Sequence, residues 1–274
     1  MYTDILYEVI DPVALITLNR PASMNAWTDA MGVEVNHALA QAAADPAVVG
    51  IVITGNGRAF CAGADMKTLS NLSSRRGPAS DREHVSAPSV DGSGDFTGRF
   101  PYLMTIDKPI IAAVNGAVAG MAFPFTLCCD LRVVSPDAVF LTAFAQRGLI
   151  AEWGLSWLLP RLVGPSVALD LLMSSRKVGG EEALTLGLAN YLVAAEDLVP
   201  FCRRYIERLD VTCSPTSMAV MKRQVYEQIH VGLGDAERAA AKLMVESFDR
   251  DDFGEGVRSF LEKRPPVFAR LPRR

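Results

Sequence analysis

Two segments of the chain share a pattern in which a run of strand-forming residues ends at a glycine. The first is VVGIVITG at 48–55 and the second is IIAAVNG at 110–116; small residues and then a helical pattern follow each of them. Apolar runs of this length, bounded by glycine, are typical of buried strands. The repetition of strand, glycine turn, small residues and helix therefore predicts an α/β fold.

The flanking segments fit this fold class. Residues 5–10 and 13–18 predict two strands joined by a turn at Asp11-Pro12, and 28–45 predicts a helix with Thr28 as its N-cap. Short strands are expected at 131–135 and 139–141, and a last one at 190–194. Short helices are expected at 155–164, 165–175 and 180–189, and long amphipathic ones at 196–210, 214–231, 235–248 and 252–262.

The character of the chain changes near residue 195. We therefore predict an α/β core over 1–195 and a helical region over 196–274. Residues 70–98 are rich in Ser, Gly, Pro and charge, which predicts a long mobile loop. This loop is either a solvated insertion or a lid over a pocket, and His84, Asp81, Glu83 and Asp95 within it are weak candidates to approach a substrate.

Charge and composition exclude several classes of function. With 27 basic and 31 acidic residues, the net charge of −4 gives no general attraction to nucleic acid or to an anionic membrane. No apolar run of about 18 residues is present, so we expect no membrane span. The first residues lack the features of a signal peptide, and the five cysteines form no framework. We expect reduced thiols and a cytoplasmic protein.

Motifs for metal and nucleotide chemistry are missing. The sequence contains no GxxxxGK[ST], HExxH, CxxC or GxSxG pattern, and GNGRAF lacks the third glycine of a dinucleotide fingerprint. The adjacent Cys128 and Cys129 lie in an apolar helical pattern and are expected in the core. We therefore expect neither a metal site nor a cofactor.

The two glycine turns could do chemistry through their backbone. If Asp65 caps a short helix, the N–H near Ala64 points outward at its N-terminus, and the turn NGAVAGMAF offers a similar donor near Met121. Two such donors converging on one oxygen would form an oxyanion hole. The alternative is that both are simply tight turns of an α/β core. Pro124 is harmless in a first helical turn, and Phe123 and Phe125 would pack or line an apolar wall.

Several stretches resemble the enoyl-CoA hydratase/isomerase family, the crotonase superfamily. They run nearly end to end: LNRPASMNAW (18–27), VITGNGRAFCAGADM (52–66), KPIIAAVNGAVAGMAF (108–123), CDLRVVSPDAVF (129–140), GLSWLLPRLVG (154–164), EALTLGLANYLV (182–193) and FLEKRPPVF (260–268). The resemblance implies a crotonase-like spiral of ββα units with a helical C-terminal trimerisation region, assembled as a homotrimer or a dimer of trimers. It also implies a CoA thioester as ligand, with coenzyme A as part of the substrate.

The resemblance also assigns roles to individual residues. The thioester carbonyl would accept hydrogen bonds from the amides of Ala64 and Met121, which agrees with the physical interpretation of the two turns. Ala62 and Asp65 would lie beside the adenine, and Ala22, Met24 and Ala26 would line the CoA entrance. Phe260 and Lys263 would reach the CoA of a neighbouring subunit, beside a basic C-terminal run that suits phosphates.

The sequence departs from the family pattern where hydratases carry two glutamates. Pro124 and Phe144 occupy those positions, and Met121 stands where a glycine is usual. One carboxylate remains, Glu152, in a segment where many relatives carry an acid. Flanked by Ile150, Trp153 and Trp157, it could be desolvated and could transfer protons. The structural alternative for Glu152 is a helix N-cap or a surface acid.

Three functional hypotheses follow. The first is an enzyme that stabilises a thioester enolate and moves a proton with Glu152, with isomerisation favoured over hydration because one base can remove and redeliver one proton. The second is an acyl-CoA-binding protein without turnover. The third is a CoA-ester hydrolase or a C–C lyase that uses the same oxyanion site.

Overall fold

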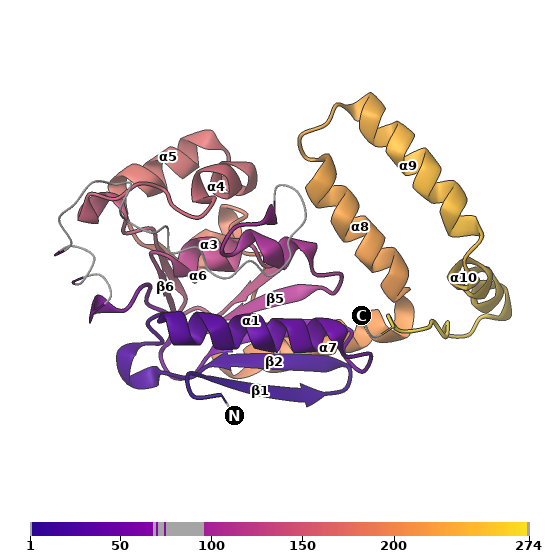
Figure 1. The fold of residues 1–274 in the computed structure, drawn as a ribbon, viewed down its shortest axis with the longest axis horizontal. Helices are drawn as coiled ribbons and strands as arrows, with labels where there is room; N and C mark the ends of the chain where they lie inside the picture. The colour runs from indigo at the N-terminus through magenta and orange to yellow at the C-terminus, as the bar shows by residue number, and fades with distance from the viewer. Residues whose placement is uncertain (1, 68–69, 71–73, 75–95, 273–274) are drawn as a thin grey trace.

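The computed structural model describes residues 2–67, 70, 74 and 96–272. Most of the loop predicted at 70–98 lies outside these residues, and so do His84, Asp81, Glu83 and Asp95. Figure 1 shows the described chain as an α/β body with two helices, α9 and α10, standing apart from it.

The larger sheet has six strands in the order β1-β2-β3-β5-β7-β10. Their bounds are Ile5–Ile10, Val13–Leu18, Gly50–Gly55, Ile110–Val114, Leu131–Val134 and Tyr191–Leu192. β1 and β2 form an antiparallel pair around the turn at Asp11-Pro12, and the ladders from β2 to β10 are parallel. β3 begins two residues later than predicted because the Val48 amide closes a turn on the Asp45 carbonyl at 3.0 Å.

A second sheet gives the body its spiral shape. It contains the short strands β4 (Ala59–Cys61), β6 (Ala117–Ala119), β8 (Val139–Leu141) and β9 (Val178–Gly179), in that order. Along the chain, β4 follows β3, β6 follows β5 and β8 follows β7. These three short strands run parallel to one another. Successive turns of the chain thus add one strand to each sheet, which confirms the predicted spiral architecture and explains the repeated strand–glycine pattern.

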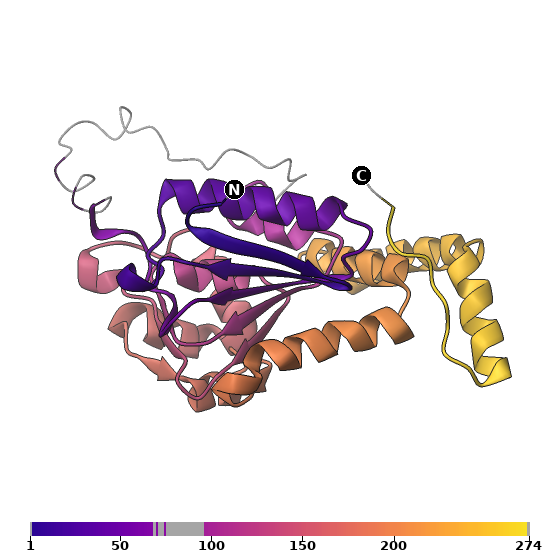
Figure 2. The same cartoon turned by 90° about the horizontal axis from the view of Figure 1, so that it is seen from below.

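Helices cover both faces of the larger sheet. α1 (Asp29–Ala44) begins at the predicted N-cap, where the Thr28 hydroxyl accepts from the Met31 amide at 3.0 Å. α7 (Leu198–Thr212) lies on the opposite face, as Figure 2 shows. Alternate strand residues therefore enter separate cores: Ile51 and Ile53 join the α1 side, whereas Val52 packs with Cys202 of α7. This two-sided burial is why β3 reads as a continuous apolar run.

Four helices form the part of the body around the second sheet. They are α3 (Ala122–Leu127), α4 (Leu155–Val163), α5 (Pro165–Ser174) and α6 (Gly180–Thr185). α6 is shorter than the helix predicted at 180–189 because Gly187 adopts a left-handed φ of 76°, which ends it. Cys128 and Cys129, just after α3, are buried as predicted.

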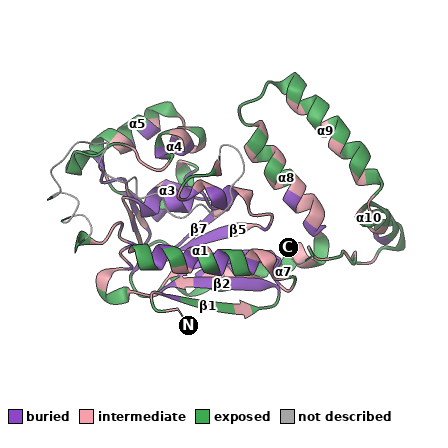
Figure 3. Cartoon of the chain, viewed as in Figure 1, coloured by how far each residue is buried: buried purple, intermediate pink, exposed green. Residues whose placement is uncertain are grey.

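The C-terminal helices extend away from the body. They are α8 (Pro215–Gln228), α9 (Leu233–Phe248) and α10 (Asp251–Glu262). No residue of α9 is buried, and Figure 3 shows how much of its surface is exposed. None of the helices in the described part of the chain is long and apolar enough to cross a bilayer.

A polar network anchors α8 to the body. The Lys222 ammonium donates to Asp130 Oδ2 at 2.8 Å and to the carbonyls of Leu103 and Lys108 at 3.2 and 3.1 Å. The Tyr226 hydroxyl donates to Asp130 Oδ1 at 2.9 Å. Asp130 follows α3 in the chain, so this network joins the helical region to the part of the core that carries the second glycine turn.

Candidate active site

The two glycine turns of the sequence touch each other. Gly63 has a left-handed φ of 95°, and a Cβ placed on it would lie 2.8 Å from the Ala119 carbonyl oxygen and 3.8 Å from Gly120 Cα. The parallel pairing of β4 with β6 brings them together, because each turn directly follows one of these strands. The absence of a side chain at Gly63 is what permits the contact.

The backbone pairing of Ala64 fixes where its amide points. Trp27 forms an isolated parallel bridge with Ala64, donating from its amide to the Gly63 carbonyl at 2.7 Å and accepting from the Asp65 amide at 3.0 Å. In such a bridge, the bridging residue of the partner strand directs its own N–H to the opposite side. The Ala64 N–H therefore faces away from Trp27, and the preceding residue, Gly63, lies against Ala119 and Gly120 of the second turn.

Met121 supplies the corresponding amide of the second turn. It follows Gly120, which has a left-handed φ of 52°, and it is the N-cap residue of α3. N–H groups at the start of a helix have no acceptor within the helix. Within the described residues, neither Ala64 nor Met121 donates a backbone hydrogen bond in a turn, loop or cap. Both amides are thus open donors beside the contact between the turns.

The residues assigned to the CoA entrance and those assigned to the adenine lie on two neighbouring segments of backbone. Ala22, Met24 and Ala26 occupy one, and Ala62 and Asp65 the other, where the Ala62 amide donates to the Met24 carbonyl at 3.0 Å. Asp65 caps a helical turn through its Oδ1, which accepts from the Lys67 amide at 3.0 Å, as the sequence predicted. This bond and the nearby Arg20 lower the pKa of the Asp65 carboxyl.

Pro124 and Phe144, which the family resemblance places where glutamates were expected, are buried groups that cannot transfer protons. Pro124 lies in the first turn of α3, and Phe144 is 4% exposed. Phe144 contacts Trp153 with ring centroids 6.4 Å apart, and Trp153 in turn contacts Phe100. Phe123 and Phe125 are fully buried, so they pack in the core.

Glu152 is a half-buried carboxylate just before α4. The N-cap of α4 is Gly154, so the N-cap alternative for Glu152 is wrong. No other described residue forms a hydrogen bond or an ion pair with its carboxylate. Burial alone raises the pKa of the Glu152 carboxyl above its ordinary 4.5. Because α4 packs against α3, this acid belongs to the same part of the body as Met121.

The last two assigned residues lie elsewhere. Phe260 is 82% exposed near the end of α10, and Lys263 follows this helix. Figures 1 and 2 show α10 far from β6, so a single chain does not bring them to the two turns.

Among the residues that the structure describes, no three His, Cys, Asp or Glu side chains are grouped to hold a metal ion. The cysteines are free thiols, and burial raises the pKa of Cys61 to about 12, which leaves it unreactive.

Two side chains that organise this site, Arg20 and Asn25, were not predicted from the sequence. Arg20 contacts Asp65 across 45 positions of sequence, and Asn25 donates to the carbonyls of Asn56 and Ala59 at 2.9 and 2.8 Å. The only signal for them in the sequence was that Arg20 and Asn25 are polar residues within LNRPASMNAW.

Gly63→Ala tests whether the two turns must touch. We expect it to lower the free energy of unfolding by roughly 3 kcal/mol or more, because a left-handed φ is combined with a backbone clash. Gly148→Ala is the matched control, since Gly148 also has a positive φ, of 67°, but nothing lies within 4 Å of its added Cβ. The control should lose only about 1–2 kcal/mol. Equal losses in urea titrations of the two variants would argue against the contact.

Comparisons with known proteins identify the family. The family model for enoyl-CoA hydratase/isomerase matches residues 8–270. A probable enoyl-CoA hydratase of Rhodobacter capsulatus is 35% identical over 97% of this chain and 98% of its own. A crotonyl-CoA hydratase of Syntrophomonas wolfei is 31% identical with the same coverage. The crystal structure of an enoyl-CoA hydratase from Bacillus anthracis superposes with a TM-score of 0.87, at 25% identity over 97% of this chain and 99% of that one.

The family-model match includes the two glycine turns and the C-terminal helices, and it covers every named strand and helix except the start of β1. The chain therefore belongs to the enoyl-CoA hydratase/isomerase family.

Proposed function

We propose that this protein is an enzyme that binds an acyl- or enoyl-CoA thioester and stabilises its enolate. The thioester oxygen accepts hydrogen bonds from the Ala64 and Met121 amides, which strengthen as the oxygen becomes anionic. The observation that carries the proposal is the contact of Gly63 with Ala119, beside which both amides are open. The relatives that bear hydratase names support the ligand class.

Glu152 transfers the proton in this proposal. Its carboxylate removes a proton from the α or γ carbon of the acyl chain and returns it to the other position, so the double bond moves. Ordinary hydration is disfavoured because Pro124 and Phe144 cannot hold or activate a water molecule. The raised pKa supports the role, since a desolvated carboxylate is a stronger base than one in water.

The pH dependence of the reaction follows from this pKa. Glu152 must be ionised to act as a base, so kcat/KM falls as the pH drops through the pKa of the free enzyme. Because burial raises that pKa, the acidic limb should lie above the ordinary 4.5. Initial rates measured over a range of enoyl-CoA concentrations between pH 4 and 8 give kcat/KM and locate this acidic limb. A limb at or below the ordinary value would contradict a desolvated base.

We also propose that copies of the chain assemble into a trimer or a dimer of trimers in the cytoplasm. α9 has no buried residue, and Leu233, Met244 and Phe248 on it are half exposed or more. Apolar faces of this kind are characteristic of protein interfaces. Assembly would allow Phe260 and Lys263 to reach the CoA of a neighbouring copy.

Light scattering with size-exclusion chromatography measures this assembly. The chain mass is 29.6 kDa, and we expect a particle of three or six times that mass. A monomer at micromolar concentration would contradict the assembly and the shared CoA site.

Two other functions would use the same pair of amides. The protein could bind acyl-CoA without turnover, since Pro124 and Phe144 remove two catalytic carboxylates, or it could act as a CoA-ester hydrolase or a C–C lyase. Incubating the protein with enoyl-, dienoyl- and 3-hydroxyacyl-CoAs in D₂O separates these functions. Deuterium in recovered substrate supports the proposal, tight binding without product or exchange supports the binding protein, and free CoA or a shortened acyl chain supports the third function.

A further inference from the structure

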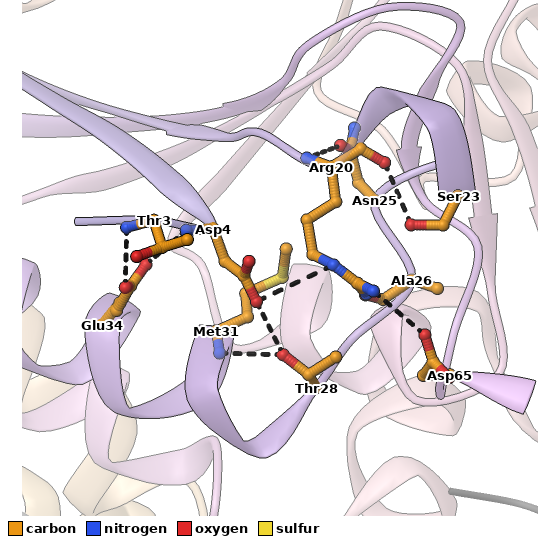
Figure 4. Close-up of polar contacts among 10 residues, drawn as sticks. All are labelled: Thr3, Asp4, Arg20, Ser23, Asn25, Ala26, Thr28, Met31, Glu34 and Asp65. Atoms are coloured by element: carbon orange, nitrogen blue, oxygen red, sulfur yellow. Dashed lines mark hydrogen bonds and ion pairs between the residues drawn. The ribbon is translucent and has the colours of Figure 1, made fainter. Parts of the chain in front are cut away.

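The Arg20 guanidinium joins three segments beside the candidate site, as Figure 4 shows. Its Nη1 donates to the Ala26 carbonyl, its Nη2 donates to Asp65 Oδ2 at 3.2 Å, and its Nε lies 3.8 Å from Asp4 Oδ2. All three side chains are largely buried: 25% of the Arg20 side chain is exposed and 17% of each aspartate. Ion pairs at this depth are screened less than surface pairs, and their geometry is better defined.

The two groups that accept hydrogen bonds from Arg20, the Ala26 carbonyl and the Asp65 carboxylate, both belong to residues next to the Trp27–Ala64 pairing. Ala26 precedes Trp27, whose amide and carbonyl bond to Gly63 and Asp65 on either side of Ala64. Asp65 follows Ala64 directly, and its second carboxylate oxygen caps the next helical turn through the Lys67 amide. Arg20 therefore holds together the two segments that pair at Trp27 and Ala64, and this pairing sets the orientation of the Ala64 peptide.

Asp4 connects the same guanidinium to the start of α1. The Thr28 hydroxyl donates to Asp4 Oδ2 at 2.8 Å while it accepts from Met31 as the N-cap of that helix. Glu34, also on α1, accepts from the amides of Thr3 and Asp4 at 2.8 Å each. The loop that carries Ala64 is thus tied through Arg20 to a long helix, which limits how far the loop can tilt.

From these contacts we infer that Arg20 is a positioning residue that aligns the Ala64 amide with the thioester oxygen by tying the Ala26 carbonyl to Asp65. The inference rests on the proposed function, since it gives a role to an amide of the proposed oxyanion hole. Arginine suits this task because its planar fork donates in fixed directions to two acceptors at once. A lysine could satisfy only one of these acceptors well.

The infrared carbonyl stretch of a bound thioester reports the alignment directly. A saturated acyl-CoA labelled with ¹³C at the thioester carbonyl is unreactive in isomerisation and hydration, so it stays intact during the measurement. Hydrogen bonds from the two amides lower its stretching frequency relative to the free thioester. We expect Arg20→Met to lose about half of this shift or more, because one of two donors is misaligned. We also expect kcat to fall roughly 10- to 100-fold, with a smaller change in KM.

Two further variants complete the design. Arg176→Met is the matched control, because Arg176 also pairs with two carboxylates, Asp170 at 2.7 Å and Glu182 at 2.8 Å, but lies between α5 and α6. It should keep the full shift. Asp65→Asn is used if Arg20→Met does not fold; it keeps an oxygen for the Lys67 amide and weakens the bond to Arg20, so part of the shift should be lost.

The outcomes separate this inference from the proposed function. If the wild-type protein binds the thioester without any shift, the oxyanion hole itself is wrong. If the wild type shows the shift and both Arg20→Met and Asp65→Asn keep all of it, the role of Arg20 is overturned while the oxyanion hole stands. A shift reduced in these variants and intact in Arg176→Met supports the inference.

Discussion

Glu152→Gln abolishes the exchange of substrate C–H protons with D₂O and lowers kcat by roughly 10²- to 10⁴-fold, while acyl-CoA binding persists. This result is expected because glutamine keeps the shape of the side chain but cannot accept a proton at neutral pH. Among the described residues, nothing pairs with this carboxylate, so its removal breaks no hydrogen bond or ion pair. Burial raises the pKa of the Glu152 carboxyl, so the group that glutamine replaces is a partly desolvated carboxylate.

The measurement is deuterium incorporation by mass spectrometry or NMR, paired with acyl-CoA binding by calorimetry. Glu181→Gln on α6 is a suitable control, because Glu181 is an exposed acid outside the site, and it should exchange protons at the wild-type rate. Exchange that is unchanged in Glu152→Gln would exclude Glu152 as the base. Loss of both exchange and binding would point to a structural role instead.

Lys222→Met is expected to lower the free energy of unfolding by about 3 kcal/mol. The side chain is only 9% exposed, and its ammonium is the shared donor to Asp130 and to the carbonyls of Leu103 and Lys108. Methionine preserves most of the volume, so the loss reflects charge and hydrogen bonding rather than a cavity. The remaining Asp130 carboxylate would then lie largely buried without its ion-pair partner, which is the costly part.

Urea titration at a fixed protein concentration measures this loss. Arg223→Met is the control on the same helix, since Arg223 is 48% exposed and its nearest carboxylate contact, Asp107, is at 3.8 Å. Because the Arg223 side chain is half exposed and the contact is long, we expect the control to lose only about 0–1 kcal/mol. If Lys222→Met loses no more than Arg223→Met, α8 is not anchored through Asp130.

The sequence alone was sufficient to predict the local elements. Thr28 as the N-cap of α1 and the strand over 139–141 follow from residue types within a few positions of each other, and the structure has both. The capping of a helical turn by Asp65 was predicted in the same way. Each of these features depends on residues that are close together in the chain, so a local sequence pattern is enough to predict it.

Contacts between distant segments could not be predicted in this way. β4 and β6 have three residues each, too few to show a period of two, so the pairing that brings Gly63 to Ala119 was not visible. Asp130 and Lys222 are 92 positions apart, and no local pattern pairs them. That Ala64 and Met121 lie close together was predicted only from the family resemblance and from the hypothesis that the two turns form one oxyanion hole.

In the proposed mechanism, two backbone amides from separate turns hold one thioester oxygen. A crystal structure with an unreactive acyl-CoA bound tests it most directly. We expect the thioester oxygen at about 2.7–3.1 Å from the nitrogens of both Ala64 and Met121, with the α carbon facing Glu152. A thioester oxygen that contacts only one of these nitrogens, or neither, would contradict it.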